Sequence, residues 1–208
     1  MITFPKHTFV GKFLAKEQLY SRDIITGALK QSLIDDVAKI TIEYNFSSRT
    51  LNVEEGTVFP EITVLKIVLK RREINMRLLD ALDRAIPSSY ILFILESDDE
   101  QCVSIAHKEK TTTITLSKRW CTEWSDALSL DIRGTTIDQI YRGFIEQVSG
   151  GSVSGNSAEQ LRDSVFGDVE RDKIIRQIAK LESKLYNENQ FNKQIEIKRQ
   201  IDELKGKL

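Results

Sequence analysis

The stretch from Asp168 to Leu208 reads DVERDKIIRQIAKLESKLYNENQFNKQIEIKRQIDELKGKL. It is rich in charge, contains no proline, and has no glycine before Gly206. Apolar residues recur every three or four positions in two runs, Ile174, Ile178, Leu181 and Leu185, then Ile197, Ile201, Leu204 and Leu208. This spacing places each run on one face of an α-helix, so the stretch predicts two amphipathic helices.

Two arrangements of these helices fit the spacing. Leu185 and Ile201 lie sixteen residues apart (201 − 185), which is not a whole number of heptads. The polar cluster Asn187-Glu188-Asn189-Gln190 lies between the two runs, where the chain could turn. We therefore expect an antiparallel helical hairpin, and a continuous coiled coil with a shifted register is the alternative.

The composition limits the class of protein. The chain has 208 residues, of which 40% are hydrophobic and 29% charged, and its formal net charge is −1. This balance is typical of a globular protein and favours neither nucleic acid nor membrane as the partner. No apolar run is long enough to span a membrane, and the N-terminus lacks the pattern of a signal peptide. We expect a cytoplasmic protein.

Cysteine and histidine are too sparse to indicate a metal site. The two cysteines, Cys102 and Cys121, form no CxxC motif, and His7 and His107 lie far apart. Zinc sites need four such ligands at characteristic spacings. We therefore expect no structural metal and no cofactor.

Upstream of the helical stretch, helical and strand-like patterns alternate. We expect an irregular arm at 1–23. Ile40 fits both the helical pattern that precedes it and the strand pattern that follows it. The expected helices, the last two capped by Asn75 and Thr136, lie at 26–40, 75–87 and 136–148. The expected strands lie at 39–46, 61–70, 90–95, 101–109, 111–119 and 128–132, with Lys108-Glu109-Lys110 at a bend. This order predicts an α+β fold with a mostly antiparallel sheet flanked by helices.

A segment rich in serine and glycine separates this part from the helical stretch. Residues 149–157 read SGGSVSGNS, a composition typical of a flexible linker. We therefore divide the chain into an α+β domain (1–148), a linker (149–157) and a C-terminal helical hairpin (158–208). A short amphipathic piece before the hairpin is expected to end at Gly167.

The sequence contains no signature that indicates an enzyme: GxGxxG, GxxxxGK[ST] and GxSxG are all absent. The strongest enzymatic alternative is a metal-dependent nuclease, with Glu61 acting beside Lys66 or Lys70. These pairs lie five and nine positions apart, so each pair points to opposite faces of a strand. We expect no catalytic residue and keep a degenerate nuclease as the alternative.

Basic residues near aromatic ones indicate a second alternative, binding of DNA or another nucleic acid. The candidates are Lys66, Lys70, Arg71 and Arg72 along one expected strand, and Lys118, Arg119, Trp120 and Trp124 after another. Cations contact phosphates, and exposed rings stack on bases. The competing interpretation is that the lysines protect edge strands and the tryptophans lie in the core.

Several segments resemble a bacterial family known only as domain of unknown function 4391. They are Phe4-Pro5-Lys6-x-Thr8, Thr50-Leu51-Asn52-Val53, Glu61-Ile62-x-Val64, Leu78-Leu79-x-x-Leu82-Asp83-x-x-Ile86-Pro87 and Glu188-Asn189-Gln190-Phe191-Asn192-Lys193-Gln194-Ile195-Glu196-Ile197. The sequence departs from the family's pattern at Ala15, where the family usually has proline, and at Asn189, where it has lysine. Ser88 and Ser89 also stand between Pro87 and Tyr90, whereas in the family the tyrosine usually follows the proline directly. The resemblance implies an accessory protein that accompanies DNA methyltransferases or helicases in bacterial restriction or antiviral defence systems. It implies no catalytic residue.

The motif around Phe191 has two interpretations. Phe191 could fold back against Leu185 or Leu181 while Gln190 and Asn192 bond to the turn, or the tip could recognise a partner. Our leading hypothesis is a non-enzymatic accessory protein whose hairpin docks a helicase, a methyltransferase or a second copy of the chain. The residues assigned to this role are Ile174, Ile178, Leu181, Leu185, Gln190, Phe191, Asn192, Ile197, Ile201 and Leu204.

Overall fold

The computed structural model describes residues 1–20, 25, 27–110 and 112–208. The chain forms two compact units, Met1–Asn156 and Ser157–Leu208. Residues 21–23 of the expected arm lie outside the described residues, as do Thr26 and Thr111, where an expected helix and an expected strand begin.

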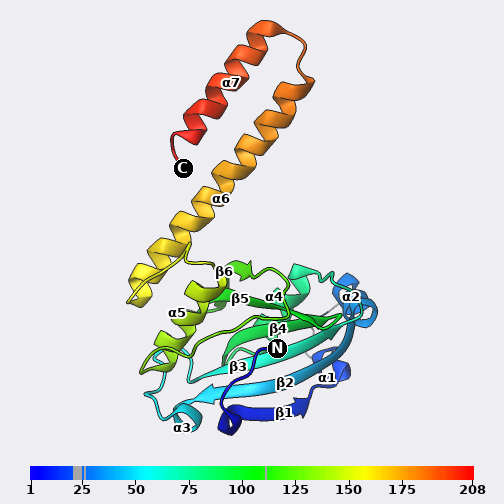
Figure 1. Cartoon of the computed structure of the whole chain (residues 1–208), viewed down its shortest axis with the longest axis vertical. Coiled ribbons are helices and arrows are strands. Elements are labelled where there is room, and N and C mark those ends of the chain that lie inside the picture. The colour runs from blue at the N-terminus through cyan, green and yellow to red at the C-terminus, as the bar shows by residue number, and fades with distance from the viewer. Residues whose placement is uncertain (21–24, 26, 111) are drawn as a thin grey trace. The chain divides into compact units, whose positions relative to one another are not determined.

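The first unit is built on a six-stranded sheet whose strands lie in sequence order (Figure 1). The strands are β1 (Phe9–Phe13), β2 (Val37–Ser47), β3 (Glu61–Leu69), β4 (Tyr90–Ser97), β5 (Glu100–Lys110) and β6 (Ile114–Cys121). Neighbouring strands are antiparallel except β3 and β4, which are parallel and joined by α4 (Met76–Ala85). The predicted α+β class with a mostly antiparallel sheet is confirmed.

The strands form where β-branched and apolar residues alternate or run continuously. β2 begins at Val37, so Ile40 belongs to a strand, where it pairs with Ile67 of β3. β4 is central and its residues are buried on both faces except for the half-buried Glu96. A nearly continuous apolar run is what a strand covered on both faces requires.

Helices cover both faces of this sheet. On one face α2 (Ala28–Asp36) and α4 pack over a core that includes Leu33, Leu79 and Phe93. On the other face α5 (Ile137–Val148) brings Phe144 against Phe46 of β2, with ring centroids 5.9 Å apart. The predicted N-caps are present: the side chains of Asn75 and Thr136 accept the backbone N–H groups of Arg77 and Gln139.

Two expectations for irregular or extended segments are wrong. The arm contains regular elements: η1 (Lys6–Thr8), β1 and α1 (Lys16–Tyr20). Residues 128–132 form no strand, because the side chain of Gln147 accepts the N–H of Asp131 and donates to its carbonyl. A further short helix, α3 (Ser48–Leu51), lies between β2 and β3.

The second unit is a pair of helices, α6 (Ala158–Asn187) and α7 (Phe191–Lys205), joined by Glu188–Gln190. Ile178, Ile197 and Ile201 are buried between the helices. Four more residues of the predicted faces pack against them, Ile174, Leu181, Leu185 and Leu204. The helices are in contact, as the predicted hairpin requires.

α6 does not end at Gly167, contrary to the expectation for the short amphipathic piece. The helix continues through this glycine to Asn187. A glycine inside a helix costs only about 1 kcal/mol relative to alanine, and neither a proline nor a capping residue follows to stop the helix.

Candidate functional site

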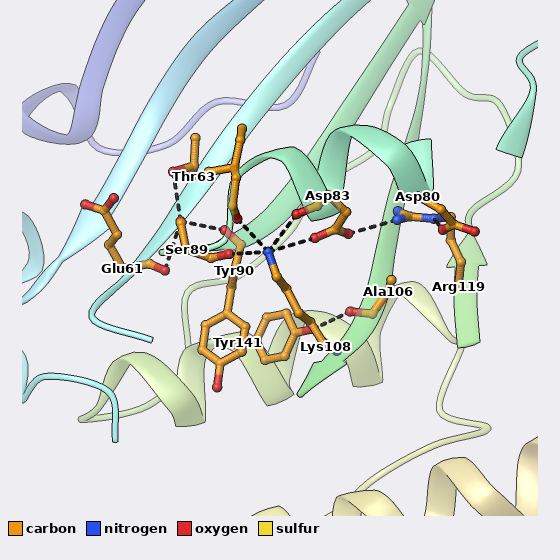
Figure 2. A network of polar contacts seen from close by, with 11 residues as sticks. Glu61, Thr63, Asp80, Asp83, Ser89, Tyr90, Ala106, Lys108, Arg119 and Tyr141 are labelled. Carbon is orange, nitrogen blue, oxygen red and sulfur yellow. Dashed lines mark hydrogen bonds and ion pairs between the residues drawn. The ribbon is translucent and has the colours of Figure 1, made fainter. Parts of the chain in front are cut away.

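A buried lysine lies at the junction between β5 and the end of α4 (Figure 2). The Nζ of Lys108 donates to the backbone carbonyls of Asp83, Ile86 and Ser89, at 2.9, 2.8 and 2.7 Å. Two of these carbonyls lie at the C-terminal end of α4, where the helix itself offers no partner. Lys108 on β5 therefore caps the C-terminal end of α4 and holds the segment that follows the helix. The expectation of a bend at Lys108 is wrong, because β5 continues to Lys110.

Carboxylates balance the charge of this buried lysine. Oδ1 of Asp83 lies 3.1 Å from the Nζ of Lys108, and Oδ2 lies 2.8 Å from Nη2 of Arg119 on β6. The Nε of Arg119 is 2.8 Å from Asp80. Burial raises the pKa of the Asp83 carboxyl and lowers the pKa of the Lys108 ammonium, and the attraction between the two groups opposes both shifts. The charge of Arg119 opposes the rise at Asp83 but adds to the lowering at Lys108. Two helix carboxylates and two strand cations thus form one linked cluster.

Two stacked tyrosines tie α5 to the same cluster. The hydroxyl of Tyr141 donates to the carbonyl of Ala106 and accepts the N–H of Lys108. Its ring stacks on Tyr90 of β4 with centroids 3.7 Å apart. The hydroxyl of Tyr90 donates to Asp138 at 2.8 Å. Burial and the Asp138 carboxylate both raise the pKa of Tyr90, so this hydroxyl stays a donor.

A cavity of about 620 Å³ lies on the sheet face that α4 covers. Its floor comes from β2 and β3 and includes Ile42, Asn45, Glu61 and Thr63. Its walls come from η1, β1, α1 and the segment after α4, and include Thr8, Leu14, Gln18, Ile86 and Pro87. We call this the sheet cavity. It lies at the end of β2 and the start of β3, beside the segment that follows α4.

The lysine cluster supports one wall of the sheet cavity. The carbonyl of Ser89 accepts from Lys108, and the hydroxyl of Ser89 lies 2.8 Å from the hydroxyl of Thr63 and 3.1 Å from the carbonyl of Glu61. On the floor, Nδ2 of Asn45 donates to Oε2 of Glu61 at 2.9 Å. The wall and the floor are therefore held in place by hydrogen bonds within the first unit.

The segments that carry the family resemblance meet around this cavity. Thr8, Thr50, Glu61, Ile86 and Pro87 come from four of those segments, and all of them line it. A family model described as "Domain of unknown function (DUF4391)" matches residues 2–208. The chain belongs to this family. No curated protein and no solved structure matches the chain.

The basic residues proposed for nucleic acid lie in two groups on this DUF4391 chain, because β4 and β5 separate β3 from β6. In the first group, three side chains bond within the protein: Lys66 to Glu96, Arg71 to Asp36, and Arg72 to Glu100, each within 2.8 Å. The Nζ of Lys70 donates to the carbonyl of Ile34.

The side chains of the second group make contacts within the protein. The guanidinium of Arg119 belongs to the lysine cluster, and Trp120 is buried. Trp124 packs against the core, and the ammonium of Lys118 lies 5.8 Å from the centre of the Trp120 ring. Nucleic-acid binding through these residues stays a prediction.

The residues of the nuclease alternative are not brought together. Lys66 bonds to Glu96, and Glu61 bonds to Asn45 on the floor of the sheet cavity. Across residues 1–20, 25, 27–110 and 112–208, no three His, Cys, Asp or Glu side chains gather so as to hold a metal ion. Within the same ranges, no helix has the length and hydrophobicity needed to cross a membrane.

The tip of the hairpin differs from the first interpretation of its motif. The side chain of Phe191 is 72% exposed and does not close against the buried face of α6. The turn is held by Glu188, whose carboxylate accepts the N–H of Gln190 and whose carbonyl accepts from the side chain of Gln194. Gln190 and Asn192 therefore do not hold the turn through their side chains in the way we expected.

Lys108, Asp83 and the sheet cavity were not assigned a functional role from the sequence. A lysine flanked by Glu109 and Lys110 is typical of a solvated bend. A usable signal was the run from Gln101 to His107, whose residues are all buried in β5 and lead directly into Lys108.

Proposed function

We propose that this protein is a non-enzymatic accessory protein that docks a partner protein through the tip of its C-terminal hairpin. The observation that carries the proposal is a second apolar stripe on α7. Ile197 and Ile201 face α6, whereas Phe191 and Ile195 are 72% and 54% exposed. A helix that needed only to pack against α6 would not require this second stripe.

The second stripe belongs to a groove. Leu185, Phe191, Gln194, Ile195 and Lys198 line a depression of about 520 Å³, which we call the tip face. Phe191 and Ile195 are one helical turn apart, the spacing at which a helix presents side chains to an amphipathic partner helix. The tip face therefore suits an apolar helix of another protein.

Charge around the tip favours a partner with acidic flanks. Lys198 is the charged residue of the tip face. A neighbouring groove is lined by Lys180 and Lys184 against the single anion Glu188. A second copy of the chain would bring the same cations to the contact, whereas an acidic-flanked helix would complement them. The family resemblance implies that this partner is a helicase or a DNA methyltransferase of a bacterial DNA-modification or antiviral defence system.

The experiment compares full-length chains that differ only at the tip face. Phe191→Ala with Ile195→Ala removes the stripe, and Ile175→Ala removes an exposed apolar residue of α6 outside this groove. Affinity capture from the source cells identifies candidate helicases and methyltransferases, and each is then purified and titrated with the three chains. We expect the double variant to bind about thirtyfold more weakly, since buried apolar anchors contribute about 2 kcal/mol. The control should bind normally.

Two results would overturn the proposal or redirect it. Equal affinity of the wild type and the double variant for every captured partner would exclude the tip face as the docking surface. The second result would come from sedimentation analysis of the wild type and the double variant. A wild-type dimer that becomes a monomer in the double variant would assign the tip face to a second copy and exclude the heterologous partner.

A further inference from the structure

We propose that the sheet cavity binds a small molecule that combines an apolar body with a positively charged or N–H-donating head, and that Glu61 anchors the head. This binding site would lie in the first unit and is independent of partner docking by the hairpin.

The size and lining of the cavity suit such a ligand. Its volume of about 620 Å³ lies within the range of small-molecule sites, about 300–1,000 Å³. Leu14, Leu19, Ile42 and Ile86 supply apolar surface from four different segments. Ligand sites typically combine such walls with a few polar groups that fix the orientation of the ligand.

Most hydroxyl groups that line the cavity are already engaged. The hydroxyl of Thr8 donates to the carbonyl of Pro5, and that of Thr50 donates to the carbonyl of Asn45. The hydroxyl of Thr63 bonds to Ser89. These groups shape the cavity, but they leave the recognition of a ligand to other side chains.

Glu61 is the carboxylate among the described lining residues. Asn45 holds its Oε2 and so fixes the orientation of the carboxylate, whereas its Oε1 makes no hydrogen bond within the described part of the chain. An oriented carboxylate with a free oxygen accepts from an ammonium, amidinium or amino group. No lysine or arginine is among the described lining residues, where His7 is the one side chain that could carry a positive charge, so the Glu61 carboxylate disfavours an anionic head.

Hydrogen bonds hold two sides of the cavity in place without a ligand. Lys108 and Ser89 fix the wall that contains Ile86 and Pro87. On the other side, Ser47 and Thr50 form a reciprocal capping box at the start of α3. A preformed site loses little conformational entropy on binding, which favours affinity.

The family segments supply an independent argument. The sequence resembles the family in short segments that are far apart along the chain, and four of them contribute lining residues: Thr8, Thr50, Glu61 and Ile86. Thr8 and Thr50 make hydrogen bonds that the fold itself needs. A glutamate at the cavity floor is what a binding site requires in addition.

Three indole probes with equal apolar bodies and different heads test the charge preference. They are tryptamine, which carries an ammonium, tryptophol, which carries a hydroxyl, and indole-3-acetate, which carries a carboxylate. Each is titrated to millimolar concentration into the ¹⁵N-labelled full-length chain, and amide shifts are followed by NMR. We expect tryptamine to shift the amides of Asn45, Glu61 and Ile86 and to bind at least about tenfold more tightly than indole-3-acetate.

Two variants, Glu61→Gln and Ser88→Trp, test the anchor and the location of the site, and Glu73→Gln is the control. Glu61→Gln keeps the shape of the side chain and its bond from Asn45 but removes the charge, and we expect tryptamine to bind it about tenfold more weakly. Glu73→Gln, an exposed residue outside the cavity, should bind as the wild type does. Ser88→Trp places a ring at the exposed edge of the cavity and should abolish the shifts of all three probes.

The outcomes that overturn the inference are separate from those for the hairpin. Absence of any shift at millimolar tryptamine would exclude a site for this ligand class. Equal binding of tryptamine and indole-3-acetate, or equal binding of tryptamine by wild type and Glu61→Gln, would exclude Glu61 as the anchor. If only amides outside the cavity shift, the sheet cavity is excluded as the binding site.

Discussion

The ammonium nitrogen of Lys108 lies 3.1 Å from a carboxylate oxygen of Asp83, and the two side chains are each 1% exposed. Removing one buried charge leaves the other without a full partner, and it also leaves the carbonyls at the end of α4 without a donor. We therefore expect Lys108→Met to lower the free energy of unfolding by about 3–5 kcal/mol. Urea denaturation of the full-length chain measures this loss.

The same strand supplies the control. Lys110 lies at the exposed end of β5, so Lys110→Met should change the free energy of unfolding by less than about 0.5 kcal/mol. If the two methionine variants are equally stable, Lys108 does not hold the end of α4.

The packing of the hairpin depends on the buried face of α7. Ile201 is buried against α6, and Ile201→Ala should cost about 2–5 kcal/mol within the second unit. Hydrogen exchange should then show lost protection across α6 and α7, while amides of the sheet keep their protection. Ile195→Ala, at an exposed position of the same helix, should leave exchange unchanged. Equal exchange in both variants would contradict this packing.

The thiol of Cys121 is expected to react at unusually low pH. The neighbouring side chains of Cys102 and Ser104 and the charge of Arg119 lower the pKa of Cys121 to about 6. Because the thiolate is the nucleophile, alkylation by iodoacetamide should rise through pH 6 and level off above it. Mass spectrometry of the labelled peptide follows the reaction. Cys102, which is buried, should stay unlabelled in the native chain, and a rise only at pH 8–9 would contradict the shift.

Asp138 accepts from three donors at the start of α5. Its carboxylate takes the hydroxyl of Tyr90 and both the N–H and the hydroxyl of Thr57. Asp138→Asn replaces one accepting carboxylate oxygen by an NH₂ group, which would face donors instead of accepting from them. We therefore expect the free energy of unfolding, measured by heat or urea, to fall by about 1–3 kcal/mol. Asp131→Asn, at an exposed ion pair with Arg133, should have little effect. Similar losses in both would argue against a special role for Asp138.

Periodicity was sufficient to predict the elements whose apolar faces are local in sequence. Ile178 and Ile201 fall on helical faces that the spacing alone identifies, and the alternation from Ile40 to Phe46 matches a strand. Short segments without such periods were predicted less well. Residues 128–132 have strand-like composition, yet the side chain of Gln147 bonds to their backbone from a helix that follows.

The candidate site was not predictable in the same way because its parts are tertiary. Lys108 is buried only because the end of α4, twenty or so residues earlier, presents carbonyls and a carboxylate to it. The sheet cavity exists because η1, α1 and the segment after α4 come together over the end of β2 and the start of β3. The sequence left two interpretations of Phe191 open, and the side chain is exposed because α7 already buries a face against α6 with Ile197 and Ile201.

α6 is thirty residues long and α7 fifteen, and Lys205 near the end of α7 pairs with Glu182 of α6. At a rise of about 1.5 Å per residue, α6 extends roughly 45 Å, and its first half runs beyond the end of α7. The tip face, in contrast, comes from the end of α6 and from α7. Removing two whole turns from the first half would therefore shorten α6 by about 10 Å without altering the residues of the tip face.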